Sequence, residues 1–246
     1  MGRWARPADH RGCPGEAPAI GVDIAEDDNA TPVTSLPFEV YRLPSFDAAQ
    51  AAALVLAGEP GWGDWATNSL VDTVGLSRVA RFDGTFESTS PYGFRVVRFP
   101  APLDAGWYLV VVPREGRDRQ ALLQVTSLSA FALTSDTRTL TWVNDIATSA
   151  PVAGAVIADP QGRRIGTTDG TGLSDVATPA SLARLEVDSI DEPTILTVTA
   201  PDGRRLLVTL GMRSNTMAYD WARNETSQAG TASRRWWRLF STDRAT

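Results

Sequence analysis

Residues 140–173 read LTWVNDIATSAPVAGAVIADPQGRRIGTTDGTGL, and this stretch decides the fold. At its start, Leu140 and Trp142 alternate with Thr141 and Val143, which is the two-residue repeat of a β-strand. Residues 145–151 contain Asp, Ser and Pro, which favour turns and interrupt strand pairing. The sequence therefore predicts a strand over 139–144 that is followed by a connection.

The second half of the stretch predicts further short strands. Residues 152–158 form an apolar run of small and β-branched side chains, in which Gly154 marks the close approach of another element. A turn at 159–162 leads to a short strand over 165–168, and the sequence DGTG at 169–172 predicts a tight turn with positive φ. Short strands separated by such turns are typical of an immunoglobulin-like β-sandwich.

The same stretch resembles the macroglobulin-type domains in the N-terminal half of bacterial alpha-2-macroglobulins. In that family a tryptophan strand leads into an N/D-D-x-x-T-x-x-P-V-x-G-A connection, and a T-D-x-x-G turn follows. Ser149 departs from this pattern, because a glycine is common there in the family. The matching positions, to which the resemblance assigns a structural role, are Trp142, Asn144, Asp145, Thr148, Pro151, Val152, Gly154, Ala155, Thr168, Asp169, Gly172 and Leu173.

The preceding part of the chain predicts another β domain. Strand patterns of five to seven residues recur over 78–82, 94–99, 107–112 and 120–126. Residues 46–57 are rich in helix formers, with Asp47 as the predicted N-cap, and indicate a short helical insert. The G-x-Y-L-V strand at 106–110 also resembles the macroglobulin family, where a final strand and a crossover, here 127–135, lead to the next domain.

We therefore expect an all-β chain of two consecutive macroglobulin-like, immunoglobulin-like antiparallel β-sandwich domains at 19–127 and 128–212. In the second domain, alternation predicts a strand over 183–187, and residues 195–200 and 205–210 flank a Pro-Asp-Gly hairpin turn. Residues 1–18 are rich in Arg, Pro and Gly, and we expect a disordered tail there.

Residues 213–246 are expected to be a linker toward a missing next domain. They contain RRWWRLFSTDR at 234–244, and in the macroglobulin family an aromatic pair followed by T-D-R leads into the opening of a further domain. The chain is then a fragment. In a fragment Trp236, Trp237 and Phe240 lack the partner surface that would bury them.

Composition limits the possible partners and cofactors. The net charge of −6 gives no general attraction to nucleic acid or to an anionic membrane surface. No segment approaches the roughly 20 apolar residues of a membrane span, and no apolar signal region occurs near the N-terminus. The single Cys13 excludes an internal disulfide and a Cys-based zinc site. The sequence also contains no Gly-rich phosphate loop and no metal-ligand cluster, so we expect neither metal nor cofactor.

We expect no catalytic residues in this sequence. The only histidine, His10, lies in the predicted tail, which argues against a Ser-His-Asp or Cys-His arrangement. Asp169 with Asp175, or Asp188 with the carboxylates at 191–192, remain an acid–base alternative, but such residues are far more common in turns and on surfaces. Cys13 does not belong to a Cys-x-Glu-Gln thioester unit, which lies far toward the C-terminus in the macroglobulin family.

By this resemblance the chain is a non-catalytic scaffold within a protease-trapping endopeptidase inhibitor. Its partners would be neighbouring macroglobulin-like domains of a longer chain, and a target protease only in the full-length protein. The location would be the periplasm or the cell envelope. The alternative is a free-standing immunoglobulin-like adhesion or carbohydrate-binding module, with Trp62 and Trp65 as its binding platform.

Overall fold

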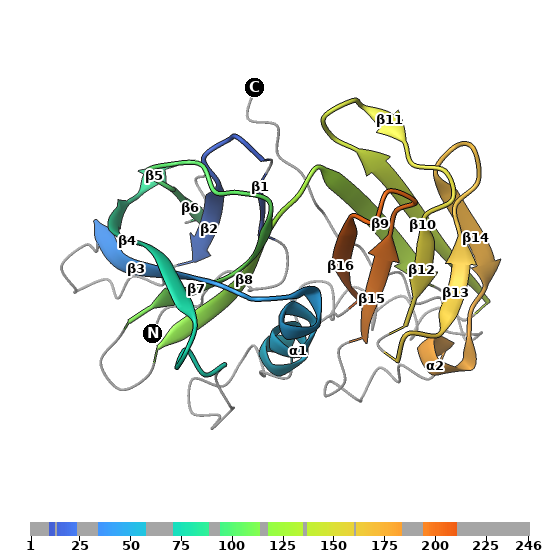
Figure 1. Cartoon of the computed structure of the whole chain (residues 1–246), viewed down its shortest axis with the longest axis horizontal. Helices are drawn as coiled ribbons and strands as arrows, with labels where there is room; N and C mark the ends of the chain where they lie inside the picture. The colour runs from blue at the N-terminus through green and yellow to red at the C-terminus, as the bar shows by residue number, and fades with distance from the viewer. Residues whose placement is uncertain are drawn as a thin grey trace, which may run out of the picture. The chain divides into compact units, whose positions relative to one another are not determined.

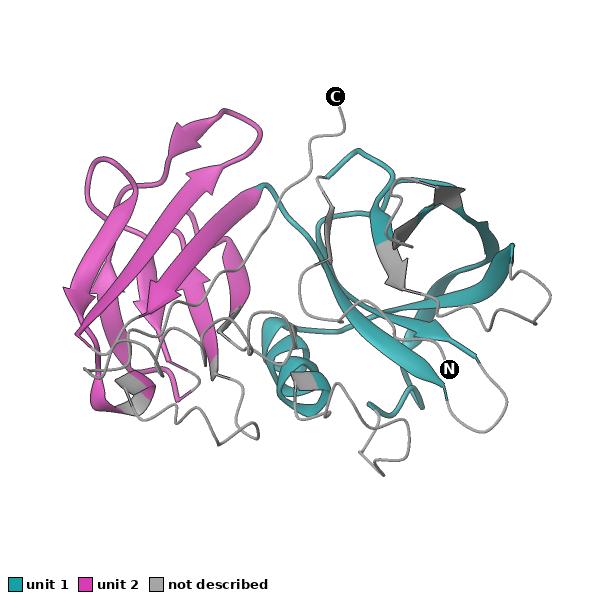
Figure 2. Cartoon of the chain, turned by 180° about the vertical axis from the view of Figure 1, so that it is seen from behind, with its two compact units in different colours: residues 1–56, 69–127 teal, residues 57–68, 128–246 magenta. Residues whose placement is uncertain are grey.

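The computed structural model describes residues 10–12, 14–23, 34–57, 71–88, 94–113, 118–134, 137–159, 161–183 and 194–210 (Figure 1). Most of the regular structure is β, with one helix of twelve residues and another of four. The chain divides into two compact units, residues 1–56 with 69–127 and residues 57–68 with 128–246 (Figure 2). The predicted fold class, two immunoglobulin-like β-sandwiches with a short helix in the first, is confirmed.

Two sheets form the first unit. The larger has five strands in the order β1-β8-β7-β3-β4, and the smaller has three in the order β2-β6-β5. Neighbouring strands are antiparallel except for β1, which runs parallel to β8. The strands are β1 His10–Gly12, β2 Ala19–Asp23, β3 Ser35–Arg42, β4 Ser77–Thr85, β5 Glu87–Ser88, β6 Phe94–Arg98, β7 Gly106–Val112 and β8 Arg119–Val125.

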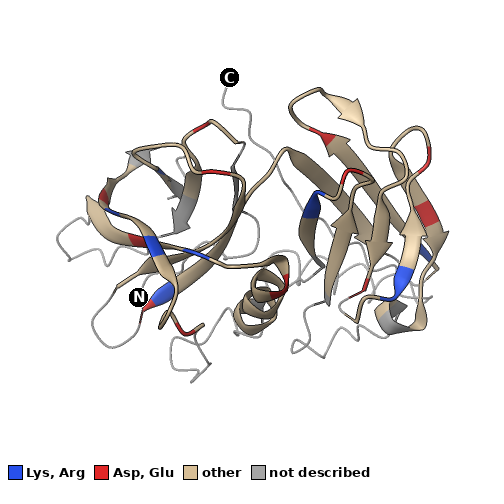
Figure 3. Cartoon of the chain, in the orientation of Figure 1, with Lys and Arg blue, Asp and Glu red and all other residues tan. Residues whose placement is uncertain are grey.

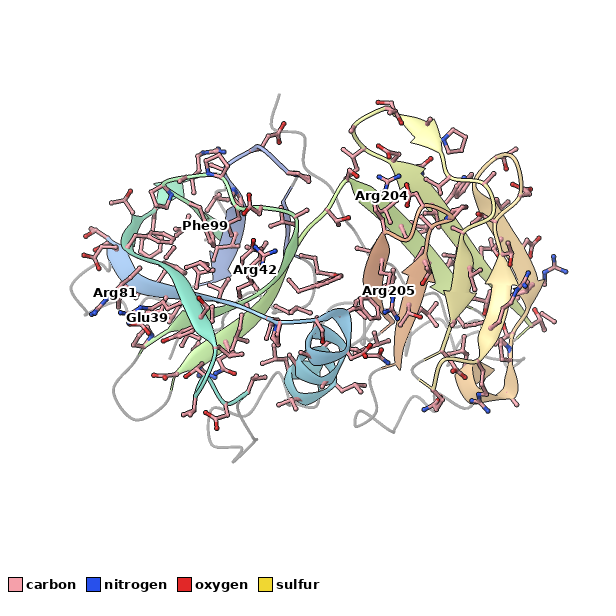
Figure 4. All side chains as sticks on the ribbon, in the orientation of Figure 1. Glu39, Arg42, Arg81, Phe99, Arg204 and Arg205 are labelled. Carbon is pink, nitrogen blue, oxygen red and sulfur yellow. The ribbon has the colours of Figure 1, made fainter. Side chains whose placement is uncertain are left out.

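A cluster of aromatic side chains lies in the core of the first unit. The fully buried Phe38 of β3 stacks on Phe82 of β4 with 5.4 Å between ring centroids, and Phe82 packs against Phe99 at 5.1 Å. Because side chains alternate along β3, Glu39 lies on the other face, where its carboxylate binds Arg81 at 3.6 Å (Figure 4). The alternating pattern of β3 thus separates the apolar core from a charged outer face.

The helix α1 (Phe46–Ala57) lies where the sequence predicted an insert, but its N-cap differs from the prediction. The Ser45 hydroxyl accepts a hydrogen bond from Ala48 N at 3.1 Å, so Ser45 is the N-cap and Asp47 is not. Asp47 lies in the first turn, where a carboxylate favours the positive end of the helix. Phe46 then packs its ring edge against Trp107 at 5.3 Å between centroids.

Part of the segment that we expected to be a disordered tail belongs to the larger sheet of the first unit. In β1, His10 pairs with Leu123 and Gly12 pairs with Val125. Farther along, Phe99 N donates a hydrogen bond to Pro18 O at 2.8 Å. Three residues of strand pairing require only a free strand edge and no hydrophobic pattern, so composition did not reveal them.

The second unit is a sandwich of two four-stranded sheets. In one, β10 lies between β9 on one side and β14 and β11 on the other, and the other has the order β13-β12-β15-β16. The elements are β9 Leu128–Thr134, β10 Arg138–Asp145, β11 Ala150–Pro151, β12 Val156–Ala158, β13 Arg164–Thr167, β14 Leu173–Ala177, α2 Ala180–Ala183, β15 Thr194–Thr199 and β16 Arg205–Leu210.

Three local predictions for the second unit were wrong. The expected crossover at 127–135 is the regular strand β9, which buries every second side chain. Residues 152–155 do not belong to β12, because Gly154 has a φ of +74°, which interrupts an extended strand. Ala183, the expected start of a strand, is the last residue of α2, and residues 184–187 lie outside the described residues.

The core of the second unit lies between its two sheets and is aliphatic. Inward side chains of both sheets meet there, as expected for a sandwich. Its buried members are Leu128, Ala130, Ala132, Val143, Ala155, Ile157, Leu182, Leu196, Val198, Ala200, Leu206 and Val208. Four of these twelve side chains are alanine, and the others are leucine, isoleucine or valine.

Basic and acidic residues are interspersed over the described ribbon of both units (Figure 3). None of the described helices has both the length and the apolar character that a membrane span requires.

Candidate functional site

The residues that carry the family resemblance meet at one end of the second unit. We call the group formed by Asp145, Val152, Thr168, Asp169 and Gly172 the motif corner; its members hydrogen-bond one another or nearby residues. These residues come from the end of β10, the loop before β12, and the turn between β13 and β14. The structure therefore brings together positions that are up to 27 residues apart in the sequence.

Asp145 organises the first turn of the motif corner. Its Oδ1 accepts hydrogen bonds from Ala147 N at 2.9 Å and from Thr148 N at 3.1 Å, so one carboxylate oxygen closes the turn after β10. Ser149 follows with a φ of 56°, the only positive value for a non-glycine residue in the described chain. This left-handed conformation explains why glycine suits the position, and Ser149 adopts it at a cost.

The second carboxylate oxygen of Asp145 bonds across the sandwich. Arg204, between β15 and β16, donates from Nη1 to Asp145 Oδ2 at 2.5 Å and from Nε to Asp202 Oδ2 at 2.7 Å (Figure 4). The hydrogen bond from Arg204 is the main reason that the pKa of Asp145 lies below its usual value, and the same guanidinium lowers the pKa of Asp202. Asp145 therefore joins the two sheets of the unit.

Thr168 bonds two backbone groups at the centre of the motif corner. Its hydroxyl donates to Val152 O at 2.6 Å and accepts from Ala155 N at 2.8 Å. The backbone continues the connection, because Gly154 N donates to Thr168 O at 2.9 Å. Thr168 is 4% exposed, so these bonds satisfy polar groups that water does not reach.

Asp169 and Gly172 shape the turn between β13 and β14. Asp169 Oδ1 accepts hydrogen bonds from the Thr171 hydroxyl at 2.7 Å, from Thr171 N at 2.8 Å and from Leu173 N at 3.1 Å. These bonds, the Thr171 hydroxyl first, lower the pKa of Asp169. Gly172 has a φ of +76°, and a Cβ there would lie 2.5 Å from Val143 O, so only glycine fits.

The remaining motif positions lie at the edge of this group. Pro151 pairs with Asn144 in the short edge strand β11, where a residue without an N–H is tolerated. Val152 N donates to Val143 O at 3.0 Å, which continues the same ladder. Thr148 contributes its backbone N–H to the Asp145 turn, and its side chain is exposed.

Trp142 does not belong to the core. It points outward from β10 and is 47% exposed, while its neighbours Thr141 and Val143 point inward and are buried. Asn144 is also exposed. The tryptophan of the motif is therefore available at the surface of this unit, in contrast to the buried Thr168.

The carboxylates that we considered for acid–base chemistry have structural partners. Asp169 caps its own turn, and Asp175 of β14 binds Arg138, which donates from Nε to Asp175 Oδ1 at 2.8 Å. Asp188 lies outside the described residues, as do Asp191 and Glu192. Within the described part of the chain, no group of three His, Cys, Asp or Glu residues is placed to hold a metal ion.

The tryptophans of the alternative binding platform, Trp62 and Trp65, also lie outside the described residues, as does Cys13. The binding role of the two tryptophans therefore stays a prediction.

The first unit contains a second hydrogen-bonded corner, around Tyr108. Its hydroxyl donates to Asp104 O at 2.7 Å and accepts from Arg42 Nη1 at 3.2 Å, and the Arg42 guanidinium lies 5.6 Å from the Tyr108 ring centroid. Burial raises the pKa of Tyr108. A tyrosine bonded to a carbonyl four residues upstream is a known corner device of immunoglobulin-like sandwiches.

Sequence reasoning missed both arginines of these corners. Arg42 is 66 residues from Tyr108, and Arg204 is 59 residues from Asp145. No local pattern links such distant positions. Only the Pro-Asp-Gly turn that precedes Arg204 indicated that this arginine lies at the end of a hairpin.

No protein-family model and no curated protein matches this chain. Among solved structures, the chain is similar to native alpha-2-macroglobulin from Escherichia coli spanning domains NIE-MG1. The sequence identity is 14%, the TM-score is 0.50, and the similarity covers 83% of this chain and 97% of that one. At this identity the similarity is one of fold.

Two longer structures are also similar. One is the Escherichia coli protein spanning domains MG0-NIE-MG1, with 16% identity, a TM-score of 0.48, and coverage of 84% of this chain and 62% of that one. The other is Salmonella alpha-2-macroglobulin reacted with methylamine, with 13% identity and a TM-score of 0.43, covering 85% of this chain and 12% of that one. The chain thus spans about an eighth of the Salmonella chain.

Proposed function

We propose that this chain is a pair of scaffold domains from a bacterial alpha-2-macroglobulin-like protein, which contribute architecture and no chemistry to a protease-trapping endopeptidase inhibitor. The first domain would end near Ser127 and correspond in fold to the domain named NIE in the Escherichia coli structure. The second would correspond to MG1. Both would hold the shell that closes around a protease after a bait segment elsewhere is cut.

The observation that carries this proposal is the use of the motif residues. In the motif corner, the side chains of Asp145, Thr168 and Asp169 all bind groups of the protein itself. Residues used in this way maintain the shape of a domain, because their polar atoms are already satisfied. A motif that maintains shape is expected in a scaffold.

We also propose partners and a cellular location for the two units. Neighbouring macroglobulin-like domains of a longer chain would contact the two units, and a target protease would be met only by the assembled protein. Residues 213–246 would lead toward the next domain. The location would be the periplasm or the cell envelope, because the trapping role that we propose requires contact with proteases outside the cytoplasm.

A trapping assay tests the proposal. The isolated chain is mixed with trypsin, and cleavage of casein and of a small chromogenic peptide is measured. The same assay is run on the longer product of the reading frame that contains this sequence. We expect the isolated chain to leave both activities unchanged, and the longer product to suppress casein cleavage while peptide cleavage continues.

Two results would contradict the scaffold role. One is inhibition of peptide cleavage by the isolated chain, because this would assign a direct protease-binding site to the two units. The other is a genomic region in which this sequence is framed by stop codons inside an unrelated operon. An in-frame Y-R-P within a few codons after Thr246 would support the role.

A further inference from the structure

Over part of its length, one sheet of the second unit buries polar side chains and turns apolar side chains outward. The buried side of β10 carries Thr139 and Thr141, each 2% exposed, and Ser174 of β14 is 3% exposed beside them. The outer side of β10 carries Leu140 and Trp142. An antiparallel sheet with one face in water normally has the opposite arrangement.

The register of the sheet assembles these outward side chains into a band. Trp142 pairs with Phe131 of β9 and with Leu173 of β14, so one row across three strands is apolar. In the next row Leu140 pairs with Leu133 and with Asp175. We call the surface formed by Phe131, Leu133, Leu140, Trp142 and Leu173 the Trp142 face.

Polar residues border the Trp142 face at both ends. Asn144 lies on one side, and the ion pair between Arg138 and Asp175 lies on the other. The Asp175 side chain remains 40% exposed beside the apolar band. The surface therefore offers an aromatic platform with one accessible carboxylate at its border, which suits a segment that combines aromatic and cationic side chains.

The size of the Trp142 face favours a tethered partner. Three strands about 4.8 Å apart and two rows about 7 Å apart give a footprint of roughly 200 Å². A stable complex between free proteins buries about 800 Å² on each partner. A tether raises the effective concentration to roughly millimolar, so a small contact can form within one chain.

The chain itself contains a segment with the complementary chemistry. Residues 234–240 read RRWWRLF and combine three arginines with three aromatic side chains and a leucine. The segment follows β16, which lies beside β9, the strand that carries Phe131 and Leu133. From Leu210 to Arg234 the chain has 24 residues, which span up to about 80 Å, far more than the width of a sandwich.

We propose that the Trp142 face binds residues 234–240 of the same chain. The aromatic side chains of the segment cover Trp142 and Phe131, and an arginine reaches the Asp175 carboxylate or stacks on the Trp142 ring. This contact lies within one chain and does not depend on the role proposed above. It also gives the aromatic pair at 236–237 a surface that covers it.

Residue-resolved oxidative footprinting of the full chain tests the contact. Three chains are compared by mass spectrometry: wild type, the triple variant Trp236→Ser, Trp237→Ser, Phe240→Ser, and the matched control Trp221→Ser. We expect the oxidation rate of Trp142 to rise about 3- to 10-fold in the triple variant and to stay within about 1.5-fold in the control, since burial in a contact limits access. Trp107 in the first unit serves as the internal reference.

The reciprocal experiment uses Trp142→Ser in the full chain, with its fold checked by circular dichroism. Because Trp142 is exposed, the second unit should remain folded, and amide exchange of residues 234–240 should become faster. Equal oxidation of Trp142 in wild type and triple variant would overturn the proposal. So would protection of Trp142 that grows with protein concentration, because this assigns the face to a second copy.

Discussion

Replacement of Thr168 by valine removes the two hydrogen bonds of its hydroxyl and keeps the shape of the side chain. The variant Thr168→Val keeps the volume and the β-branch but leaves Ala155 N and Val152 O without their partner. Ala155 is fully buried, so its unpaired N–H costs about 2 kcal/mol, and the half-buried Val152 carbonyl adds about 1 kcal/mol. The added methyl returns about 0.8 kcal/mol, so we expect a net loss of about 2 kcal/mol.

The preceding residue provides a matched control. The Thr167 hydroxyl is buried and, within the described part of the chain, has no hydrogen-bond partner. Thr167→Val therefore makes the same chemical change on the neighbouring residue but removes no bond. We expect its free energy of unfolding to be unchanged or raised by up to about 1 kcal/mol, since a buried polar atom is replaced by a methyl group.

Urea denaturation followed by circular dichroism measures both variants. A change in the midpoint at constant slope reports a change in stability without a change in the denatured state. We expect Thr168→Val to unfold at a clearly lower urea concentration than wild type, and Thr167→Val at the same or a higher one. Equal midpoints for the two variants would refute the reasoning, because the hydroxyl of Thr168 would then contribute nothing beyond its shape.

Three further predictions follow from individual contacts. Ser149→Gly should raise the free energy of unfolding by about 0.5–1 kcal/mol in urea titrations, because glycine adopts the φ of 56° without strain, whereas Ser149→Ala should bring no gain. Asp145 has a lowered pKa in the folded state, so its ion pair with Arg204 stabilises the fold above about pH 5. This stabilisation is lost as the pH falls through and below 3.8, the ordinary pKa of an aspartate. The melting temperature of Asp145→Asn should therefore depend less on pH between 5 and 2 than that of wild type. Tyr108→Phe should lower the free energy of unfolding by about 1–2 kcal/mol in the same urea assay, because the bond to Asp104 O is lost, and an unchanged midpoint would exclude that bond as a stabilising one.

Local chemistry made most strands and several turns predictable. The strands β4, β6, β7, β8, β15 and β16 lie where runs of strand-forming residues between turn residues predicted them. The turn at Gly172 was readable from DGTG, since few residues other than glycine tolerate positive φ. Two strands were missed because their sequence patterns are weak. β9, which we expected to be a crossover, alternates small residues with large ones, and β1, which we expected to be disordered, is three residues long.

The resemblance singled out the positions of the motif corner but did not indicate what each one does. Asp145, Thr168 and Asp169 are all turn-forming residue types, so the sequence suggested turns at these places. Their hydrogen bonds to Val152, Ala155 and Leu173 depend on how the loops fold over each other.

The sequence by itself determined the β class, the positions of most strands and the turns that glycine and aspartate impose, because these follow from side-chain alternation and backbone conformation within a few residues. Only the tertiary structure decided that Arg204 bonds Asp145 and that Arg42 bonds Tyr108, because strand order brings together residues that are about 60 positions apart. It also decided that Trp142 faces outward. Alternation separates two faces of a strand, but which face lies inside is fixed by the second sheet that packs against it.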